Sequence, residues 1–332
     1  MQPLPHFELL RPANLDQALT QLALPGARAL GGGTDLLPNL RRGLEQPSPL
    51  IDLGDLPGFA DIDDGAQGLS LGGGVTLARL AGDAALARSH AAIVQAAQAV
   101  AGPSHRTVAT LGGNLCQDTR CVFYNQSEWW RAANGYCLKR GGDTCHVAPQ
   151  GRRCHAAFSG DLAPALMALG AEVELRSLRG ARWLPLHLLY RDDGADALCK
   201  APDELLLRVR LPAPPTGLVS AYRKARVRGA MDFPLAGVAC ALAVDQGRLS
   251  HLSIALTGTN SRPLLLEGSA DWIGRSVDAD LLPEMQAAVG KLVQKQVSPM
   301  RSTVTASNHR RLVAAALAQR LLADLVQAAA CG

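Results

Sequence analysis

Short apolar runs alternate with helical patterns along the first third of the chain. Residues 14–22 space their apolar side chains as an amphipathic helix does, and Asn14 stands where an N-cap is expected. Pro25-Gly26 ends that helix, residues 27–30 follow as a short strand, and glycines 31–33 lead into a second helical pattern at 35–41. The pattern therefore predicts a helix, a strand, a glycine turn and another helix in close succession.

The remaining chain continues this alternation. Apolar runs predict strands at 50–53, 69–71 and 171–175, and helical patterns predict helices between 77 and 101 and at 161–170, 282–292 and 308–329. Two longer runs, 235–244 and 249–257, flank a turn and predict a β-hairpin. The order of elements predicts an α+β fold with a first domain of residues 1–215, in two lobes split near residue 56, and a smaller α+β domain at 216–332.

A segment at about 117–157 breaks the pattern. Neither a two-residue nor a 3.6-residue apolar period survives there, and polar residues, Trp and Gly dominate. A loop of about 40 residues without periodicity is either functional or held by something other than a hydrophobic core. Five of the eight cysteines fall inside it or at its edge, at positions 116, 121, 137, 145 and 154.

Composition narrows the class of protein. A chain with 48% hydrophobic and 19% charged residues is globular, and a net charge of +4 is too small to indicate nucleic-acid binding. No run of 18 apolar residues and no signal-peptide pattern is found, so we expect a cytoplasmic protein without a membrane span. Clustered thiols in such a chain indicate metal or redox chemistry before disulfides.

The glycine run is the first candidate ligand site. Gly31-Gly32-Gly33-Thr34 lies between a predicted strand and a predicted helix, where backbone N–H groups can bind an anion closely. Leu36 stands where a dinucleotide fingerprint needs its third glycine, and no Gly-Lys-Ser/Thr follows, so neither common phosphate motif is present. Alone, the run indicates a tight turn as readily as a ligand site.

A second turn at 110–114 strengthens the ligand interpretation. It follows the first by about 80 residues, and Ser159-Gly160-Asp161 precedes another predicted helix. Two glycine turns could hold one pyrophosphate, and the Asp161 carboxylate could accept hydrogen bonds from ribityl hydroxyls.

These segments carry a family resemblance. Residues 29–36, 109–115 and 160–166 resemble the FAD-binding subunits of the molybdenum hydroxylase (xanthine dehydrogenase) family, and residues 222–228 and 232–236 resemble the start of its C-terminal flavoprotein domain. The resemblance implies a PCMH-type FAD-binding fold in two N-terminal lobes, followed by an α+β domain like that of CO dehydrogenase flavoproteins. The implied FAD-binding residues are Ala29, Leu30, Gly31, Gly32, Gly33, Thr34, Asp35, Leu36, Thr110, Leu111, Gly112, Gly113, Asn114, Asp161 and Lys224. Taken alone, Lys224 is interpreted nearly as well as a solvated lysine on a strand.

The cysteine spacing fits no common metal motif. It contains no C-x2-C, so a zinc site, an iron–sulfur cluster and unliganded thiols remain comparable alternatives. His146 and His155, each beside a cysteine, keep mixed zinc ligation open. Cys116 belongs to the second glycine turn, where we expect a small buried residue.

A narrower resemblance concerns this insertion. Residues 118–130, 134–139 and 142–147 resemble the β subunits of 4-hydroxybenzoyl-CoA reductases, in which an insertion carries a 4Fe–4S cluster. The resemblance implies the ligands Cys121, Cys137, Cys145 and Cys154. The four aromatic residues at 123, 124, 129 and 130 are expected to pack around the loop, and Lys139-Arg140 and Arg152-Arg153 to be solvated charges.

No nucleophile–base pair is apparent, so we expect the chemistry to reside in cofactors, with no catalytic residue on this chain. The resemblance implies an electron-transfer subunit that accepts electrons from a low-potential, ferredoxin-like donor through 4Fe–4S and FAD. Its partners would be a 2Fe–2S small subunit and a molybdenum-cofactor large subunit, in a dimer of heterotrimers. That enzyme would convert 4-hydroxybenzoyl-CoA to benzoyl-CoA in anaerobic aromatic degradation. The alternatives are a bacterial molybdenum aldehyde oxidoreductase with outward electron flow, and a non-redox module with a structural zinc.

Overall fold

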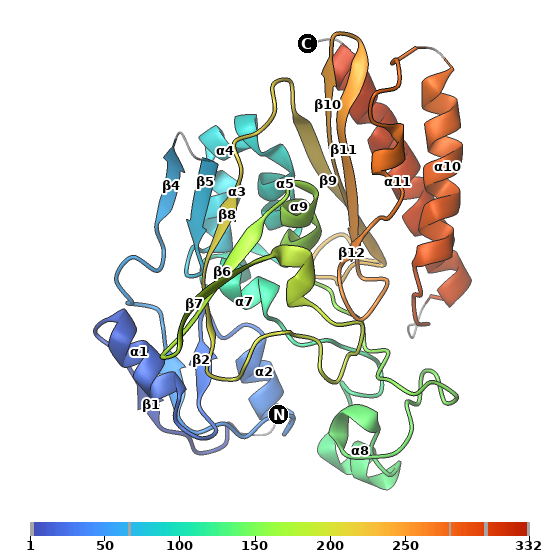
Figure 1. Ribbon diagram of the computed structural model, residues 1–332. Helices are drawn as coiled ribbons and strands as arrows, with labels where there is room; N and C mark the ends of the chain where they lie inside the picture. The colour runs from blue at the N-terminus through green and yellow to red at the C-terminus, as the bar shows by residue number, and fades with distance from the viewer. Residues whose placement is uncertain (1–2, 66–67, 279, 302–304, 331–332) are drawn as a thin grey trace.

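The computed structural model describes residues 3–65, 68–278, 280–301 and 305–330, and these residues form three sheets (Figure 1). The first is a small parallel sheet in the order β1 (Leu9–Leu10), β3 (Leu50–Asp52), β2 (Arg28–Leu30). Helix α1 (Leu15–Leu22) buries its apolar stripe in the core that contains β3, and the predicted N-cap is present, since Asn14 Oδ1 accepts a 3.0 Å hydrogen bond from Gln17 N. Helix α2 (Leu36–Arg41) follows the glycine run.

The second sheet is antiparallel, in the order β4-β5-β8-β6-β7. Its central strand β8 comes from the end of this region and pairs with β5 and β6. Helices α3, α5, α7 and α9 contribute to one core with this sheet, in which Leu71, Ile93, Leu111, Leu166 and Val209 are fully buried. The bounds of the strands are β4 (Ile62–Gly65), β5 (Gly68–Gly72), β6 (Glu172–Ser177), β7 (Gly180–Pro185) and β8 (Leu205–Leu211). Those of the helices are α3 (Leu77–Gly82), α4 (Ala84–Ser89), α5 (Ala91–Ala99), α6 (Pro103–Arg106), α7 (Leu111–Leu115), α9 (Leu162–Ala168) and the 3-10 turn η2 (Leu186–Leu189).

The third sheet is antiparallel, in the order β12 (Leu264–Leu265), β11 (Arg248–Thr257), β10 (Ala236–Asp245), β9 (Val219–Ala225). Strands β10 and β11 are the predicted hairpin. Alternate residues of β10 face opposite sides, as the period of a strand requires: Val238 and Cys240 belong to the core with α10 (Leu281–Gln296) and α11 (Ser307–Ala330), while Ala239 and Ala241 belong to the core with α5 and α9. A 3-10 turn, η3 (Ala270–Trp272), completes this region.

Helix α11 is long and apolar enough to cross a membrane by length and composition alone, over Ser307–Ala329. In the fold it lies beside α10 and against β9 and β10 (Figure 1), with Ala314, Ala318 and Leu322 buried in the C-terminal core. One face of the helix is thus packed against the C-terminal domain, as in an amphipathic helix of a folded protein.

The insertion is more ordered than its composition predicts. It contains a helix, α8 (Glu128–Ala133), capped by Ser127, whose Oγ accepts from Trp130 N at 3.3 Å, and a 3-10 turn, η1 (Leu138–Arg140). The N-cap residue Ser127 is a local helix signal, whereas the apolar period gives no signal because α8 buries only Arg131. Figure 1 shows α8 at the lower edge of the molecule, away from the C-terminal helices.

Candidate cofactor sites

The two predicted glycine turns lie in direct contact. A Cβ added to Gly32 would lie 1.8 Å from the carbonyl oxygen of Val108, and one added to Gly31 would lie 2.7 Å from Thr110 Oγ1. No side chain fits at Gly32, because the obstacle is backbone. The first turn therefore approaches the second as closely as two backbones can. The second turn supports the first from behind, because the N–H groups of residues 111–114 already donate to protein acceptors.

Hydrogen bonds within the protein fix the second turn in place. Thr110 caps α7 by accepting a 3.1 Å hydrogen bond from Gly113 N, and Leu111 N and Gly112 N donate to the carbonyls of Val75 and Gly73 at 2.8 and 2.7 Å. Asn114 Oδ1 accepts from Leu162 N at 3.3 Å, at the start of α9. The geometry of the second turn is thus set by its hydrogen bonds to residues 73–75 and to the start of α9.

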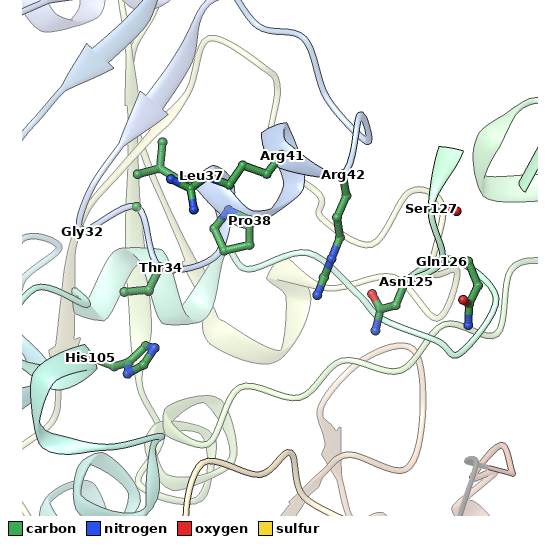
Figure 2. A pocket seen from close by; sticks show the side chains of 11 residues that line it. Gly32, Thr34, Leu37, Pro38, Arg41, Arg42, His105, Asn125, Gln126 and Ser127 are labelled. Carbon is green, nitrogen blue, oxygen red and sulfur yellow. The ribbon is translucent and has the colours of Figure 1, made fainter. Parts of the chain in front are cut away.

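A pocket of about 740 Å³ opens in front of the first turn (Figure 2). Such a volume is typical of cofactor and small-molecule sites. Figure 2 shows Gly32, Thr34 and His105 at one end, Asn125, Gln126 and Ser127 of the insertion at the other, and α2 between them. Its lining comprises Gly32, Gly33, Thr34, Leu37, Pro38, Arg41, Arg42, His105, Asn125, Gln126 and Ser127.

The pocket lining contains only some of the predicted FAD-binding residues and adds others that were not predicted. Among the predicted FAD residues, Gly32, Gly33 and Thr34 line the pocket, while 110–114 lie behind the first turn. The contribution of α2 and of the insertion was not predicted from the sequence. Basic residues at the end of the helix that follows a glycine run are a signal that could have indicated Arg41 and Arg42, whereas nothing local indicates residues 125–127.

Asp161 and Lys224 form a buried ion pair. Lys224 Nζ lies 2.9 Å from Asp161 Oδ2 and 3.1 Å from the carbonyl oxygen of Ala99, and the Tyr222 hydroxyl donates to Asp161 Oδ1. The two side chains are 5% and 4% exposed, so Lys224 is not a solvated strand lysine. Burial raises the pKa of Asp161, and Lys224 and Tyr222 oppose that rise. Neither residue is in the described pocket lining, and their contact with FAD stays a prediction.

Asp35 faces the insertion. Its carboxylate forms an ion pair with Arg120 and accepts a 2.9 Å hydrogen bond from Asp118 N. Asp35 is therefore bound by residues that precede Cys121, although it belongs to the predicted flavin turn.

The four predicted cysteine ligands line one small cavity of about 10 Å³, together with Phe123, Tyr124, Leu138, Lys139, His146 and Val147. Two backbone N–H groups point at the sulfurs: Tyr124 N lies 3.3 Å from Cys121 Sγ and Ala156 N lies 3.4 Å from Cys154 Sγ. Within the described residues, no group of three or more His, Cys, Asp or Glu side chains is arranged around a single metal-ion position.

The donor chemistry of this cavity fits an iron–sulfur cluster. Four thiols are the ligand set of a 4Fe–4S cluster, in which each thiolate binds a different iron and the four surround the cluster. A cavity the size of one water would have to widen to hold it. Burial raises the pKa of the Cys121 thiol above its ordinary value. Burial also raises the pKa of the Cys154 thiol, to about 12, so both thiols are protonated at neutral pH when no metal binds them.

Basic side chains around the cavity are not solvated, which corrects the sequence-based expectation. Lys139 is 7% exposed, lies 2.6 Å from Asp118 Oδ1 and 2.8 Å from the carbonyl oxygen of Gly194, and sits 4.5 Å from the Tyr124 ring centroid. Arg140 donates to the carbonyls of Gly43 and Leu44. Arg153 pairs with Asp192 at 2.8 Å, and only Arg152 is exposed as expected.

The aromatic and histidine residues of the insertion divide into two groups. Phe123 and Tyr124 line the cavity, and Phe123 contacts Trp130 and stacks on His146 at 5.2 Å between ring centroids. Trp129 is 77% exposed, so the expectation that it packs around the loop is wrong. His146 Nε2 hydrogen-bonds the carbonyl oxygen of Tyr136, and the described cavity lining does not include His155.

The remaining cysteines lie elsewhere. Cys116 is half-buried beside the second turn and Cys240 is fully buried in β10. Cys331 falls outside the described residues.

Comparison with known protein families identifies the family of this chain. The family of FAD binding domains in molybdopterin dehydrogenase matches residues 5–214, and that of CO dehydrogenase flavoprotein C-terminal domains matches residues 220–325. The chain belongs to the FAD-binding subunits of the molybdenum hydroxylase family. The predicted fold class is thereby confirmed, and FAD is the cofactor of the first domain's family.

Individual relatives cover nearly the whole of this FAD-binding subunit. The aldehyde oxidoreductase FAD-binding subunit PaoB of Escherichia coli (strain K12) is 31% identical over 92% of this chain and 94% of that protein. The carbon monoxide dehydrogenase medium chain of Afipia carboxidovorans is 30% identical over 85% and 84%. The solved CO dehydrogenase from Oligotropha carboxidovorans superposes with a TM-score of 0.78 at 25% identity, covering 98% of this chain and 99% of that chain.

The pocket of about 740 Å³ in front of the first turn, with Arg41 and Arg42 in its lining, fits a cofactor that carries a pyrophosphate, as FAD does. The specific prediction of 4-hydroxybenzoyl-CoA as substrate is not shown by these relatives and stays a prediction.

Proposed function

We propose that this chain is the electron-transfer subunit of a molybdenum enzyme and that it holds FAD at its glycine turns and a 4Fe–4S cluster at Cys121, Cys137, Cys145 and Cys154. One observation carries the proposal. Four cysteines from an irregular loop line a single cavity, and the same loop contributes Asn125, Gln126 and Ser127 to the pocket beside the flavin turns. The proposed cluster and the proposed flavin site therefore share one structural element.

The chain's own residues supply distinct functions at the flavin site. Gly31 and Gly32 allow the two turns to meet, so that the second turn supports the first, and the first turn presents its backbone to the pocket in which a pyrophosphate would bind. Arg41 and Arg42 add positive charge to the pocket on the side of α2. When bound, FAD supplies electron exchange in single or paired steps.

At the thiol cavity, polar groups of the protein are placed to compensate the negative charge that cysteine thiolates would carry as cluster ligands. The N–H groups of Tyr124 and Ala156 donate toward two sulfurs, and the buried ammonium of Lys139 lines the same space. Phe123, Leu138 and Val147 exclude water from it. These are the features by which a protein adjusts the potential of an iron–sulfur cluster.

The proposed partners are a 2Fe–2S small subunit and a molybdenum-cofactor large subunit, in a dimer of heterotrimers. The insertion's sequence resemblance favours 4-hydroxybenzoyl-CoA as substrate, with this chain accepting electrons from a ferredoxin-like donor and passing them to its partners. The second candidate is aldehyde oxidation with outward electron flow, favoured by the 31% identity to an aldehyde oxidoreductase subunit.

Metal analysis of the anaerobically purified chain tests the cofactor assignment. We expect about four iron and four acid-labile sulfide per chain, together with FAD, as four cysteine ligands imply. Cys121→Ser should remove the iron, whereas Cys199→Ser, which changes a half-buried cysteine outside the insertion, should not. Zinc without iron, or a flavin without its AMP part, would refute the assignment.

An assay of the assembled enzyme separates the two substrates. Reduced low-potential donor plus 4-hydroxybenzoyl-CoA should give benzoyl-CoA if the first candidate is correct. Aldehyde oxidation with reduction of an acceptor, and no benzoyl-CoA, would establish the second candidate and exclude the first.

A further inference from the structure

An ionic path joins the flavin turn to the thiol cavity. Asp35 directly follows the residues that line the flavin pocket. Its carboxylate forms an ion pair with Arg120 and accepts a 2.9 Å hydrogen bond from Asp118 N. The Asp118 carboxylate then accepts from Lys139 Nζ at 2.6 Å and from the Tyr124 hydroxyl at 2.8 Å. Lys139 and Tyr124 are themselves part of the cavity wall.

Arg120 connects the flavin turn with both ends of the insertion. It immediately precedes Cys121, and its backbone pairs with Ala157, close to Cys154, through hydrogen bonds of 2.9 and 2.8 Å. Its side chain is 9% exposed, and its Nη1 also lies 3.4 Å from the side-chain oxygen of Asn125, which lines the flavin pocket. A shift of either end of the insertion therefore moves the group that holds Asp35.

A displacement at the thiol cavity can reach the flavin turn through these contacts. The thiol cavity is about 10 Å³, so binding of a cluster would require it to widen, and a widening would displace Lys139 and Tyr124, which belong to its wall. Both side chains are bound to Asp118, which is bound to Asp35. Buried charge-assisted contacts transmit such displacements because they have few alternative partners.

We propose that the contacts of Asp35 with Arg120 and Asp118 couple the two cofactor sites, so that FAD and the cluster each strengthen the binding of the other. This inference rests on the proposed function. Arg120 is then a positioning residue: it touches neither cofactor in the proposal and acts by holding the flavin turn against the insertion. Coupling of binding free energies is reciprocal, so the same factor should appear from both directions.

The test measures FAD affinity in the full chain with its cluster and after anaerobic removal of the cluster by a chelator. In the wild type, cluster removal should weaken FAD binding by at least about 5-fold, the lower end of typical coupling between sites. In Arg120→Gln the ratio should fall close to one. Arg153→Gln is the matched control, since Arg153 also directly precedes a cysteine but pairs with Asp192, and the ratio should persist there.

A second measurement checks reciprocity. The rate of iron loss to chelator should be slowed by FAD in the wild type and in Arg153→Gln, and unchanged by FAD in Arg120→Gln. If Arg120→Gln does not fold by circular dichroism, Asp35→Asn gives the same comparison, because it removes the charge and keeps an acceptor for Asp118 N.

The outcomes are distinguishable. Equal FAD affinity with and without the cluster in the wild type, or an undiminished ratio in Arg120→Gln, would overturn the coupling and leave the proposed function intact. A purified chain with neither iron nor sulfide would overturn both.

Discussion

Gly32→Ala is the most direct test of the contact between the two glycine turns. The added Cβ would lie 1.8 Å from the carbonyl oxygen of Val108 and 2.8 Å from Ala109 N, whereas real Cβ contacts essentially never fall below 3.0 Å. Because both obstacles are backbone, no side-chain rotation relieves the clash, and the turns must separate by more than about 1 Å. Forced overpacking of this kind costs typically about 1–3 kcal/mol of unfolding free energy.

The same displacement should appear in FAD binding. If the first turn binds the pyrophosphate and the second supports it, separating the two displaces the pocket-lining backbone of residues 32–34, and a loss of about 1.4 kcal/mol weakens the affinity tenfold. The assay is urea denaturation together with flavin-fluorescence titration of the full chain. Gly31→Ala should fall between wild type and Gly32→Ala, since its Cβ meets only the Thr110 side chain, at 2.7 Å.

Gly82→Ala is the matched control for this prediction. Its Cβ would meet nothing within 4 Å, and Gly82 ends a helix, so stability should be unchanged or should rise by up to about 1 kcal/mol. If Gly32→Ala matched Gly82→Ala in stability and FAD affinity, the turns would not be in the contact described here.

Three further predictions follow from buried groups. Cys137→Ser should lose iron and sulfide by elemental analysis while FAD remains bound with an affinity reduced by the coupling factor, whereas complete loss of flavin would show that the insertion and the flavin site fold as one unit. Burial lowers the pKa of His90, so the unfolded state takes up this proton first as pH falls below about 6.5; the free energy of unfolding should decrease from pH 7 to 5.5, and His90→Asn should make that decrease smaller. Arg310 is 7% exposed and donates to the carbonyls of Pro234, Leu235, Gly258 and Met300, so Arg310→Met should lower the unfolding free energy by about 1–3 kcal/mol in urea, and an unchanged midpoint would contradict this account.

Elements with a strong local period were predictable from the sequence. The hairpin β10–β11 and the helix α11 lie within one or two residues of their predicted bounds, because two apolar runs on either side of a turn, and helical spacing, are encoded within each segment. Strand β8 was not predicted: its continuous run Leu205-Leu206-Leu207 is ambiguous between strand and buried helix, and pairing with β5 and β6 decides the outcome. Strand β4 contains Asp63 and Asp64 and is mostly exposed, so it lacks an apolar signal altogether.

The site was predictable where a motif is contiguous and not where it depends on distant contacts. The thiols at 121, 137, 145 and 154 line one cavity, while their role as cluster ligands, which the family resemblance implied, stays a prediction. The partner of Asp35 and the lining by residues 125–127 depend on contacts between segments about 85 residues apart, for which a single sequence has no local pattern.

The basic residues of the insertion show most clearly why composition misleads here. Arg131, 2% exposed, and Arg140 donate to the carbonyls of residues 42–44, directly after the C-terminus of α2. The carbonyls of Pro38, Asn39 and Leu40 at the end of α2 already accept from backbone N–H groups of residues 42–44, so the two arginines bind the carbonyls of the turn that follows the helix. A loop with few apolar residues is thereby anchored through its charges to the segment after α2, a helix whose residues line the pocket of about 740 Å³. Since the same loop carries the four cysteines, this attachment places the thiol cavity and that pocket on adjoining parts of one structure.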